Sequence, residues 1–363
     1  MRYFFGQVGN INSADVEYNP YTYLNESGAE EFLYKLINSP EKYSNYENID
    51  FINGFLKTEI IKNIDGCLYL NIPTLFVKDK EKIISVSQKY AEKLYDSVLT
   101  QSNKIEKLCG QYKFNKNISD KYMFIVICCI CLDWQALELL EKWEFLSYRV
   151  TKPGKNNEYT LTGHAYMSNN ESDPVIEPYY ANSSSAQIYD YILSSFGSGN
   201  NSIIRQCFPD ILWKNQGENI PEYYKNYLSG DINKNINFAK QFAAEITMQE
   251  SKFDLLYEQS GCKKNGVLSI PVFTQQDSSI TDTIKEIIEK VLFEWISNYI
   301  SEVECDLFDI TPLKNNFAFA DVFNYIWHNI FGICNGMLCK NGIVFNPKDN
   351  ELFNDYLPFI IYK

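Results

Sequence analysis

Apolar residues recur at steps of three and four over two long stretches of the chain, 83–105 and 280–303. This spacing places the apolar side chains on one face of an α-helix. Each stretch follows a short β-prone run that ends in Ile-Pro and is soon followed by an aspartate, Asp79 or Asp277. Aspartate is a good N-cap residue. The pattern therefore predicts a strand and then a long amphipathic helix in each half of the chain.

The two stretches align with each other at a constant shift of 198 residues. LNIPTLFVKD at 70–79 lies over LSIPVFTQQD at 268–277, and the register reaches LEKWEFL at 140–146 over LCKNGIV at 338–344. Chance supplies scattered apolar matches but seldom keeps the register while also matching the Pro and the Asp. We infer an internal duplication.

Two shorter helices are expected after each long helix. In the first half, 120–132 predicts a buried helix that is apolar on nearly every side, and 133–145 predicts a second helix beginning at Asp133. The second half repeats this pattern over 321–333 and 334–342. The expected fold class is α+β, mainly α.

A polar segment with two prolines, 168–185, is expected to link the halves. The predicted domains are thus 1–175 and 176–363. The two halves are expected either to pack about a pseudo-twofold axis or to be tethered by this linker alone.

Composition describes a globular protein. Hydrophobic residues make up 45% of the chain, charged residues 22% and aromatic residues 15%. The start of the chain does not have the pattern of a signal peptide. The most apolar window, 122–132, is shorter than the roughly 20 residues that span a bilayer. We therefore expect a cytoplasmic protein with no membrane segment.

The candidate chemistry is sparse. Ten cysteines and two histidines show no spacing typical of a zinc site, so we expect reduced, mostly buried thiols, no metal and no cofactor. His164 and His328 are interpreted as structural residues. No phosphate-binding loop, nucleophile elbow or metalloprotease helix occurs. The sequence therefore predicts no enzyme, although one sequence cannot display a site assembled from distant residues.

One segment, 148–166, gathers positive charge within a chain of net charge −13. It holds Arg149, Lys152 and Lys155 against Glu158, and its Pro-Gly turn predicts a β-hairpin. Such a hairpin could contact a phosphate backbone. The alternative is a turn that is polar because it is solvated.

The segment 118–167 runs from a helix through an aromatic-apolar pair into two strands joined by a turn. Its pattern is set by Leu137, Leu140, Phe145, Leu146, Tyr159, Leu161 and Thr162. On these residues it resembles the C-terminal part of winged helix-turn-helix domains, especially MarR-like and PadR-like bacterial transcription regulators. The wing-like runs GCLYLNIPTLF and GVLSIPVFTQQD are similar to those of uncharacterised winged-helix proteins of low-GC Gram-positive bacteria. Two features depart from the pattern: Glu144 replaces the usual glycine, and the presumed recognition helix is acidic.

The resemblance implies a winged-helix transcription regulator that binds double-stranded DNA. The second half has a degenerate wing at 345–359, where Lys348 stands alone among acids, and is not expected to touch DNA. The candidate DNA-binding residues are Gln135, Arg149, Lys152, Lys155, Asn156 and Asn157.

The alternative is a non-enzymatic protein-interaction or ligand-sensing module that does not bind DNA. It is motivated by the stretch 277–309, which carries nine acids against two lysines. A face of one charge attracts basic partners. This helix could therefore bind a basic protein or form a homodimer, or it could simply be solvated.

Overall fold

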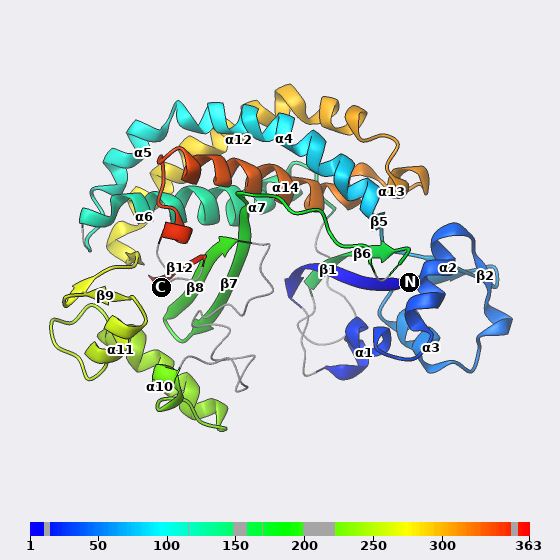
Figure 1. The fold of residues 1–363 in the computed structure, drawn as a ribbon, viewed down its shortest axis with the longest axis horizontal. Coiled ribbons are helices and arrows are strands. Elements are labelled where there is room, and N and C mark those ends of the chain that lie inside the picture. The colour runs from blue at the N-terminus through cyan, green and yellow to red at the C-terminus, as the bar shows by residue number, and fades with distance from the viewer. Residues whose placement is uncertain (11–14, 115, 148–157, 169, 199–221, 350–354) are drawn as a thin grey trace. The chain divides into compact units, whose positions relative to one another are not determined.

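The chain divides into two compact units in the computed structural model, drawn in Figure 1. The chain passes from one unit to the other several times, and one of these points, between Val175 and Ile176, is the predicted boundary of the halves. The structure describes all residues except 11–14, 115, 148–157, 169, 199–221 and 350–354. Unit 1 comprises 1–87, 139–175 and 301–327, and unit 2 comprises 88–138, 176–300 and 328–363.

Unit 1 contains a three-stranded sheet with β6 (Glu158–Tyr166) at its centre. β1 (Arg2–Asn10) pairs with β6 in antiparallel orientation over its whole length. β5 (Thr74–Phe76) pairs with β6 in parallel, opposite Gly163 to Ala165. One face of this sheet packs into an apolar core that includes Phe32.

A second sheet of unit 1 has the order β2-β4-β3. The helices α1 to α3 precede its hairpin and supply much of the same core. The remaining elements are η1 (Val16–Tyr18), α1 (Pro20–Leu24), α2 (Ala29–Asn38), β2 (Glu41–Lys42), η2 (Tyr43–Asn45), α3 (Asp50–Lys57), β3 (Ile61–Ile64), β4 (Cys67–Leu70) and α13 (Thr311–Lys314).

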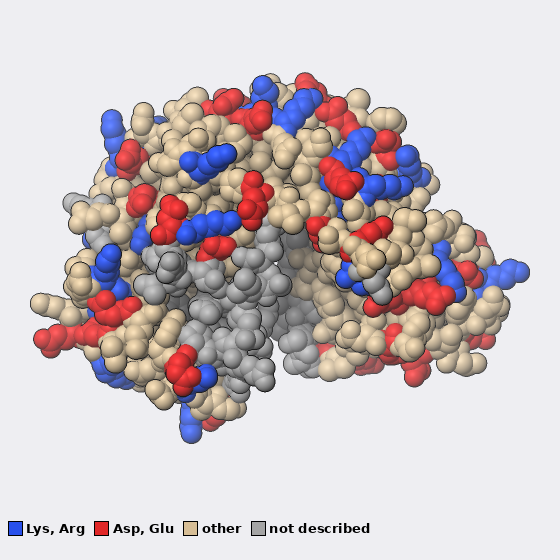
Figure 2. Space-filling view, in the orientation of Figure 1, with Lys and Arg blue, Asp and Glu red and all other residues tan. Residues whose placement is uncertain are grey.

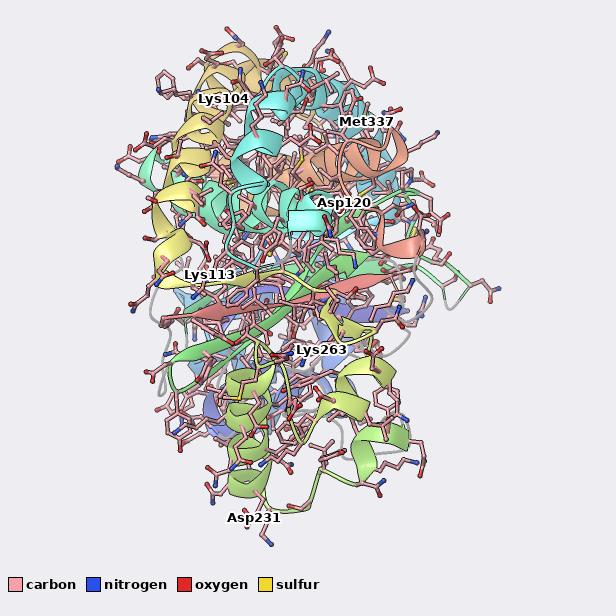
Figure 3. The ribbon with its side chains drawn as sticks, turned by 90° about the vertical axis from the view of Figure 1, so that its left-hand side faces the viewer. Lys104, Lys113, Asp120, Asp231, Lys263 and Met337 are labelled. Carbon is pink, nitrogen blue, oxygen red and sulfur yellow. The ribbon has the colours of Figure 1, made fainter. Side chains whose placement is uncertain are left out.

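Unit 2 contains a four-stranded sheet of order β11-β12-β8-β7. β12 (Tyr356–Tyr362) runs parallel to β11 (Val272–Phe273) and antiparallel to β8 (Tyr191–Ser198), which pairs with β7 (Tyr180–Ile188). Figure 3 shows this sheet between the helices that carry Lys104 and Asp120 and the region around α10. The other elements are α5 (Ser102–Cys109), η3 (Lys116–Ile118), α6 (Ser119–Met123), η4 (Phe124–Gln135), α9 (Glu222–Lys225), α10 (Ile232–Glu245), α11 (Asp254–Gln259), β9 (Lys263–Lys264), β10 (Val267–Leu268), η5 (Gln275–Asp277) and η6 (Pro347–Asp349).

The second predicted long helix is present as one helix, whereas the first, expected over 83–105, is divided between the helices Val77–Leu99 and Ser102–Cys109. The apolar stripes of both stretches are buried. Leu94 and Val98 of the first helix and Ile288 of the second are fully enclosed. The indole of Trp295 donates a hydrogen bond to the carbonyl of Tyr90 at 3.1 Å. The helices with residues in both units are α4 (Val77–Leu99), α7 (Ala136–Lys142), α12 (Ser278–Asp306) and α14 (Phe319–Lys340).

The prediction of two separate shorter helices in each half is wrong. α6, η4 and α7 follow one another without a break, and η4 has π-helical hydrogen bonding. Asp133 is buried inside η4 and does not begin a new helix. No Gly or Pro interrupts 119–142, so the backbone has no reason to turn there. α14 likewise joins the two helices expected in the second half.

The predicted linker 168–185 is wrong over its last six residues, because β7 begins at Tyr180. The next strand, β8, follows at Tyr191–Ser198. Polar and small residues hid both strands from the apolar pattern. Ser194 and Ser195 are nevertheless buried.

Several contacts recur at the offset of 198. The carboxylate of Asp79 accepts from the Phe76 N–H at 2.9 Å, and that of Asp277 accepts from the Thr274 N–H at 2.9 Å. Parallel pairing of β5 with β6 matches that of β11 with β12. The duplication of complete halves stays a prediction. The fold class, α+β and mainly α, is confirmed.

Candidate functional site

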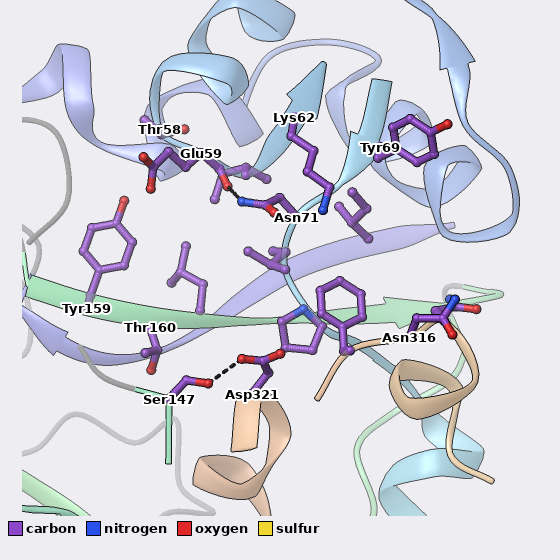
Figure 4. A pocket seen from close by; sticks show the side chains of 17 residues that line it. Thr58, Glu59, Lys62, Tyr69, Asn71, Ser147, Tyr159, Thr160, Asn316 and Asp321 are labelled. Atoms are coloured by element: carbon purple, nitrogen blue, oxygen red, sulfur yellow. Dashed lines mark hydrogen bonds between the residues drawn. The ribbon is translucent and has the colours of Figure 1, made fainter. Parts of the chain in front are cut away.

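A pocket of about 500 Å³ opens in unit 1 (Figure 4). Its walls come from the β3–β4 hairpin with the turn before it, from β6, and from the turn between α13 and α14. Small-molecule sites usually have volumes of about 300–1,000 Å³. A second pocket, of about 440 Å³, lies beside α10 and is shallower. The unit 1 pocket is the better candidate because a buried polar group faces it.

Two tight turns shape the hairpin wall. Asp65 and Gly66 both have positive φ, 51° and 80°, as a two-residue hairpin turn requires. Glu59 also has a positive φ of 59° and reverses the chain between α3 and β3. Lys62 and Tyr69 of this hairpin line the pocket, and Figure 4 shows the Lys62 side chain extending toward Asn71 while the Tyr69 ring lies at the outer end of this wall.

The edge of β6 forms the opposite wall. Three consecutive residues, 159–161, line the pocket, so it meets this strand along an edge and not on one face. β5 covers this edge only from Gly163 onward, where the Gly163 N–H donates to the Pro73 carbonyl at 2.8 Å. A side chain at Gly163 would collide with the hydroxyls of Tyr3 and Thr74.

Tyr159 is the most distinctive residue of the pocket. It is only 2% exposed, and its hydroxyl has no hydrogen-bond partner within the described part of the chain. Figure 4 shows the hydroxyl pointing toward Glu59. Burial, with Glu59 and Tyr21 nearby, raises the pKa of Tyr159 to about 12. An unsatisfied buried polar group costs about 1–3 kcal/mol, so a ligand group that reached this hydroxyl and bonded to it would recover that cost.

Asp321 is fixed at the pocket by its neighbours. One carboxylate oxygen accepts from the Ala318 N–H at 3.0 Å, and the other accepts from the Ser147 hydroxyl. The Ser147 N–H in turn donates to the Ala320 carbonyl at 3.2 Å. Among the described lining residues, Glu59 and Asp321 carry negative charge and the exposed Lys62 carries positive charge.

A second polar cluster lies on the other face of β6. The Lys80 ammonium is fully buried, donates to the Tyr166 hydroxyl at 2.7 Å and forms an ion pair with Asp173. His164 stacks on Phe4 with ring centroids 5.0 Å apart. Burial, and secondarily Lys80, lowers the pKa of His164 to about 3. The ammonium is inaccessible to a substrate, so we interpret the cluster as structural.

Of the predicted DNA-binding residues, Gln135 alone lies among the described residues. Gln135 ends η4, is half-buried, and donates to the Lys285 carbonyl at 3.3 Å. Arg149, Lys152, Lys155, Asn156 and Asn157 lie outside the described residues. The second expected wing strand is β6, which is the central strand of its sheet.

The degenerate wing and the acidic stretch are partly described. Lys348 forms an ion pair with Glu177 at 3.6 Å. Asp277 is buried and caps a helix, so it does not belong to an exposed acidic face. Other acids of α12, such as Glu286 and Glu294, are exposed. Figure 2 shows that lysines and arginines are interspersed with acids on the face in view.

The sequence missed the pocket residues. Ser147, Tyr159 and Asp321 come from three separate segments, and neither their spacing nor their type is distinctive. One usable sign was present: the repeat places Phe345 opposite Ser147, which exchanges a large residue for a small one.

One helix among the described residues, Ser119–Lys142, is long and apolar enough to cross a membrane. Its apolar window is 83% buried inside the protein, as in the core helix of a soluble protein. It is longer than the expected apolar window because the two predicted helices are joined. Within the described ranges, no group of three or more His, Cys, Asp or Glu side chains could hold a metal ion.

Comparison of the chain with protein-family models, with curated proteins and with solved structures gives no match.

Proposed function

We propose that the chain is a non-enzymatic ligand-sensing protein, located in the cytoplasm, that binds a small polar molecule in the pocket of unit 1. The observation that carries this proposal is the buried Tyr159 hydroxyl without a partner beside a pocket of about 500 Å³. Hydroxyls and amides around the pocket supply further hydrogen-bond donors and acceptors, including Thr58, Asn71 and Thr160. Apolar neighbours such as Leu161 would bury the body of a ligand.

Thermal unfolding of the full chain with a panel of amines, amino acids, nucleosides and sugars tests this proposal. A ligand at 100 times its Kd stabilises by about 2.7 kcal/mol, which raises Tm by a few degrees. The Tyr159→Phe variant should be as stable as the parent or up to about 1 kcal/mol more stable, because it removes an unpaired hydroxyl.

The same variant should show a smaller shift with any ligand that raises Tm of the parent. Tyr189→Phe serves as the control, because Tyr189 is exposed and does not line the pocket. A panel without any hit, or hits whose shift is equal in both variants and the parent, would count against binding at this pocket.

DNA binding through 148–157 remains a separate proposal that the basic residues of this segment support. Fluorescence anisotropy with a labelled DNA duplex at 50 and 200 mM salt tests it. Binding should weaken steeply with salt, and the triple variant Arg149→Gln, Lys152→Gln, Lys155→Gln should lose most of the affinity. Absence of binding at low salt would remove the proposal.

The acidic helix 277–309 also remains a proposed contact for a basic protein or for a second copy of the chain. Its exposed acids, such as Glu302 and Glu304, support this idea.

A further inference from the structure

We infer that the pocket of unit 1 takes a primary amine with an apolar or aromatic body, an inference that rests on the proposed function. Unit 2 places its own ammonium group and aromatic ring at the positions that correspond to this pocket. Backbone hydrogen bonds within each unit match one another and define the correspondence.

In the first pair of matched hydrogen bonds, the acceptor in each unit is the second residue of a helix. In unit 1 the Ser147 N–H donates to the Ala320 carbonyl at 3.2 Å. In unit 2 the Phe345 N–H donates to the Asp120 carbonyl at 3.2 Å. Ser147 therefore corresponds to Phe345. The acceptors are second residues because α6 begins at Ser119 and α14 begins at Phe319. The third residues, Lys121 and Asp321, therefore correspond in structure, one position away from the sequence pattern that places Asp120 opposite Asp321.

In the second pair of matched hydrogen bonds, the donor in each unit lies two residues before the proline that both halves share, Pro73 or Pro271. The Asn71 N–H donates to the Ile60 carbonyl at 2.9 Å, and the Ser269 N–H donates to the Cys262 carbonyl at 2.8 Å. In both units the acceptor residue follows a residue of positive φ, namely Glu59 (59°) in unit 1 and Gly261 (73°) in unit 2. Asn71 therefore corresponds to Ser269.

In unit 2 these positions hold a buried cation. Lys121 is only 8% exposed, and its ammonium donates to the Ser269 carbonyl at 2.6 Å and to the Ser269 hydroxyl at 3.0 Å. The same ammonium lies 5.0 Å from the centroid of the Phe345 ring. Burial lowers the pKa of Lys121, so the hydrogen bonds to Ser269 and the Phe345 ring offset only part of the cost of removing the ammonium from water.

In unit 1 the cation and the ring are both missing from the protein, and the pocket occupies their place. Asp321 stands where Lys121 would be, and Ser147 stands where Phe345 would be, and both line the pocket. A ligand amine would meet a carboxylate there, and its apolar body would fill the room that the small Ser147 leaves. Tyr69 and Phe317, which also line the pocket, can contact such a body.

An anionic ligand fits less well. The only cation among the described lining residues is Lys62, which is exposed, whereas Asp321 and Glu59 would repel an anion. A neutral alcohol would find the same hydrogen-bond partners as an amine but would lack the attraction of Asp321.

Isothermal titration of the full chain with three probes of one shape tests the inference: tyramine, the alcohol tyrosol and the anion 4-hydroxyphenylacetate. 3-Methylbutylamine, an apolar amine without a ring, is the fourth probe. At least one of the two amines should bind, and tyrosol and 4-hydroxyphenylacetate should each bind at least tenfold more weakly than tyramine if tyramine binds. Absence of binding by both amines, or binding of the alcohol or the anion as tight as that of tyramine, overturns the inference.

Two variants locate the binding. Ser147→Phe should abolish amine binding, because it introduces the ring that unit 2 already has. Asp321→Asn should weaken it at least tenfold while keeping an acceptor for the Ala318 N–H. Glu286→Gln, an exposed acid in unit 2, controls for the loss of one charge. Far-ultraviolet circular dichroism and Tm establish that each variant is folded.

The outcomes separate this inference from the proposed function. If Ser147→Phe removes binding of a neutral or anionic panel ligand while amines never bind, the pocket is a ligand site but the amine class is wrong. If Ser147→Phe leaves the binding of every ligand unchanged, both proposals fail.

Discussion

Tyr159 and His164, both buried polar side chains of β6, have different surroundings. Tyr159 lines the pocket and its hydroxyl has no described partner, whereas His164 is packed between Phe4 and Tyr325. Burial has the same physical effect on both, because it disfavours the charged form. For Tyr159 this keeps the hydroxyl protonated and able to donate, and for His164 it keeps the imidazole neutral.

The low pKa of His164, about 3, predicts a pH-dependent stability. The unfolded chain binds the proton with an ordinary pKa near 6.5, so the unfolded state is favoured as the pH falls below 6.5. The free energy of unfolding should therefore decrease by up to about 1.4 kcal/mol per pH unit between pH 6.5 and 4.5. The variant His164→Phe keeps a ring against Phe4 and should have a smaller slope.

Urea unfolding at several pH values measures this slope. Between pH 7.5 and 8.5 the imidazole is neutral in both states, so parent and variant should show equal slopes there, which is an internal control. Equal slopes between pH 4.5 and 6.5 as well would contradict the prediction. Asp173 has a lowered pKa and adds a loss of the same sign at lower pH, which is why the range stops at 4.5.

At the scale of elements, the sequence located the beginnings of the two long helices best. Asp79 and Asp277 do fix the beginnings of α4 and α12, but from inside the first turn: Asp277 closes a capping box in which Thr274 is the N-cap. Each aspartate also accepts a distant backbone N–H. Asp79 binds that of Thr311 at 3.0 Å, and Asp277 binds that of Lys113 at 3.1 Å.

Asp277→Ala should destabilise the protein by about 2–3 kcal/mol, because it removes a cap and leaves the N–H groups of Thr274 and Lys113 without this acceptor. Asp282→Ala is the matched control in α12, the helix that directly follows η5. Asp282 is exposed, so its loss should change stability by less than about 0.5 kcal/mol. Equal effects in chemical denaturation would show that the cap contributes little.

Elements set by local pattern were predicted, and elements set by distant contacts were not. The apolar stripe of α12 correctly predicted the burial of Trp295, because periodicity alone selects the inward face. Asp133 suggested a helix start, but tertiary burial holds it inside a continuous helix. β7 was hidden because its serines are polar in sequence and are paired to β8 by contacts that only the fold creates.

At the scale of the whole molecule, the pocket depends on residues that the sequence keeps far apart. Tyr159 comes from the first half of the chain and Asp321 from the second, although both belong to unit 1. No pattern within either half could reveal this, because each unit combines the body of one half with a segment of the other. The alignment of the halves did contain the informative exchange of Ser147 and Phe345.

This composition of the units sets an order of events during synthesis. Most of unit 1 has left the ribosome once Val175 has emerged, yet its last segment, 301–327, is made only after the whole stretch 176–300 of unit 2. At about 5–20 residues per second, the intervening chain takes on the order of 10 s to produce. The nascent first half must therefore persist through that delay with an incomplete core, and the pocket, which includes Asp321, is finished only after the segment 301–327 has been made.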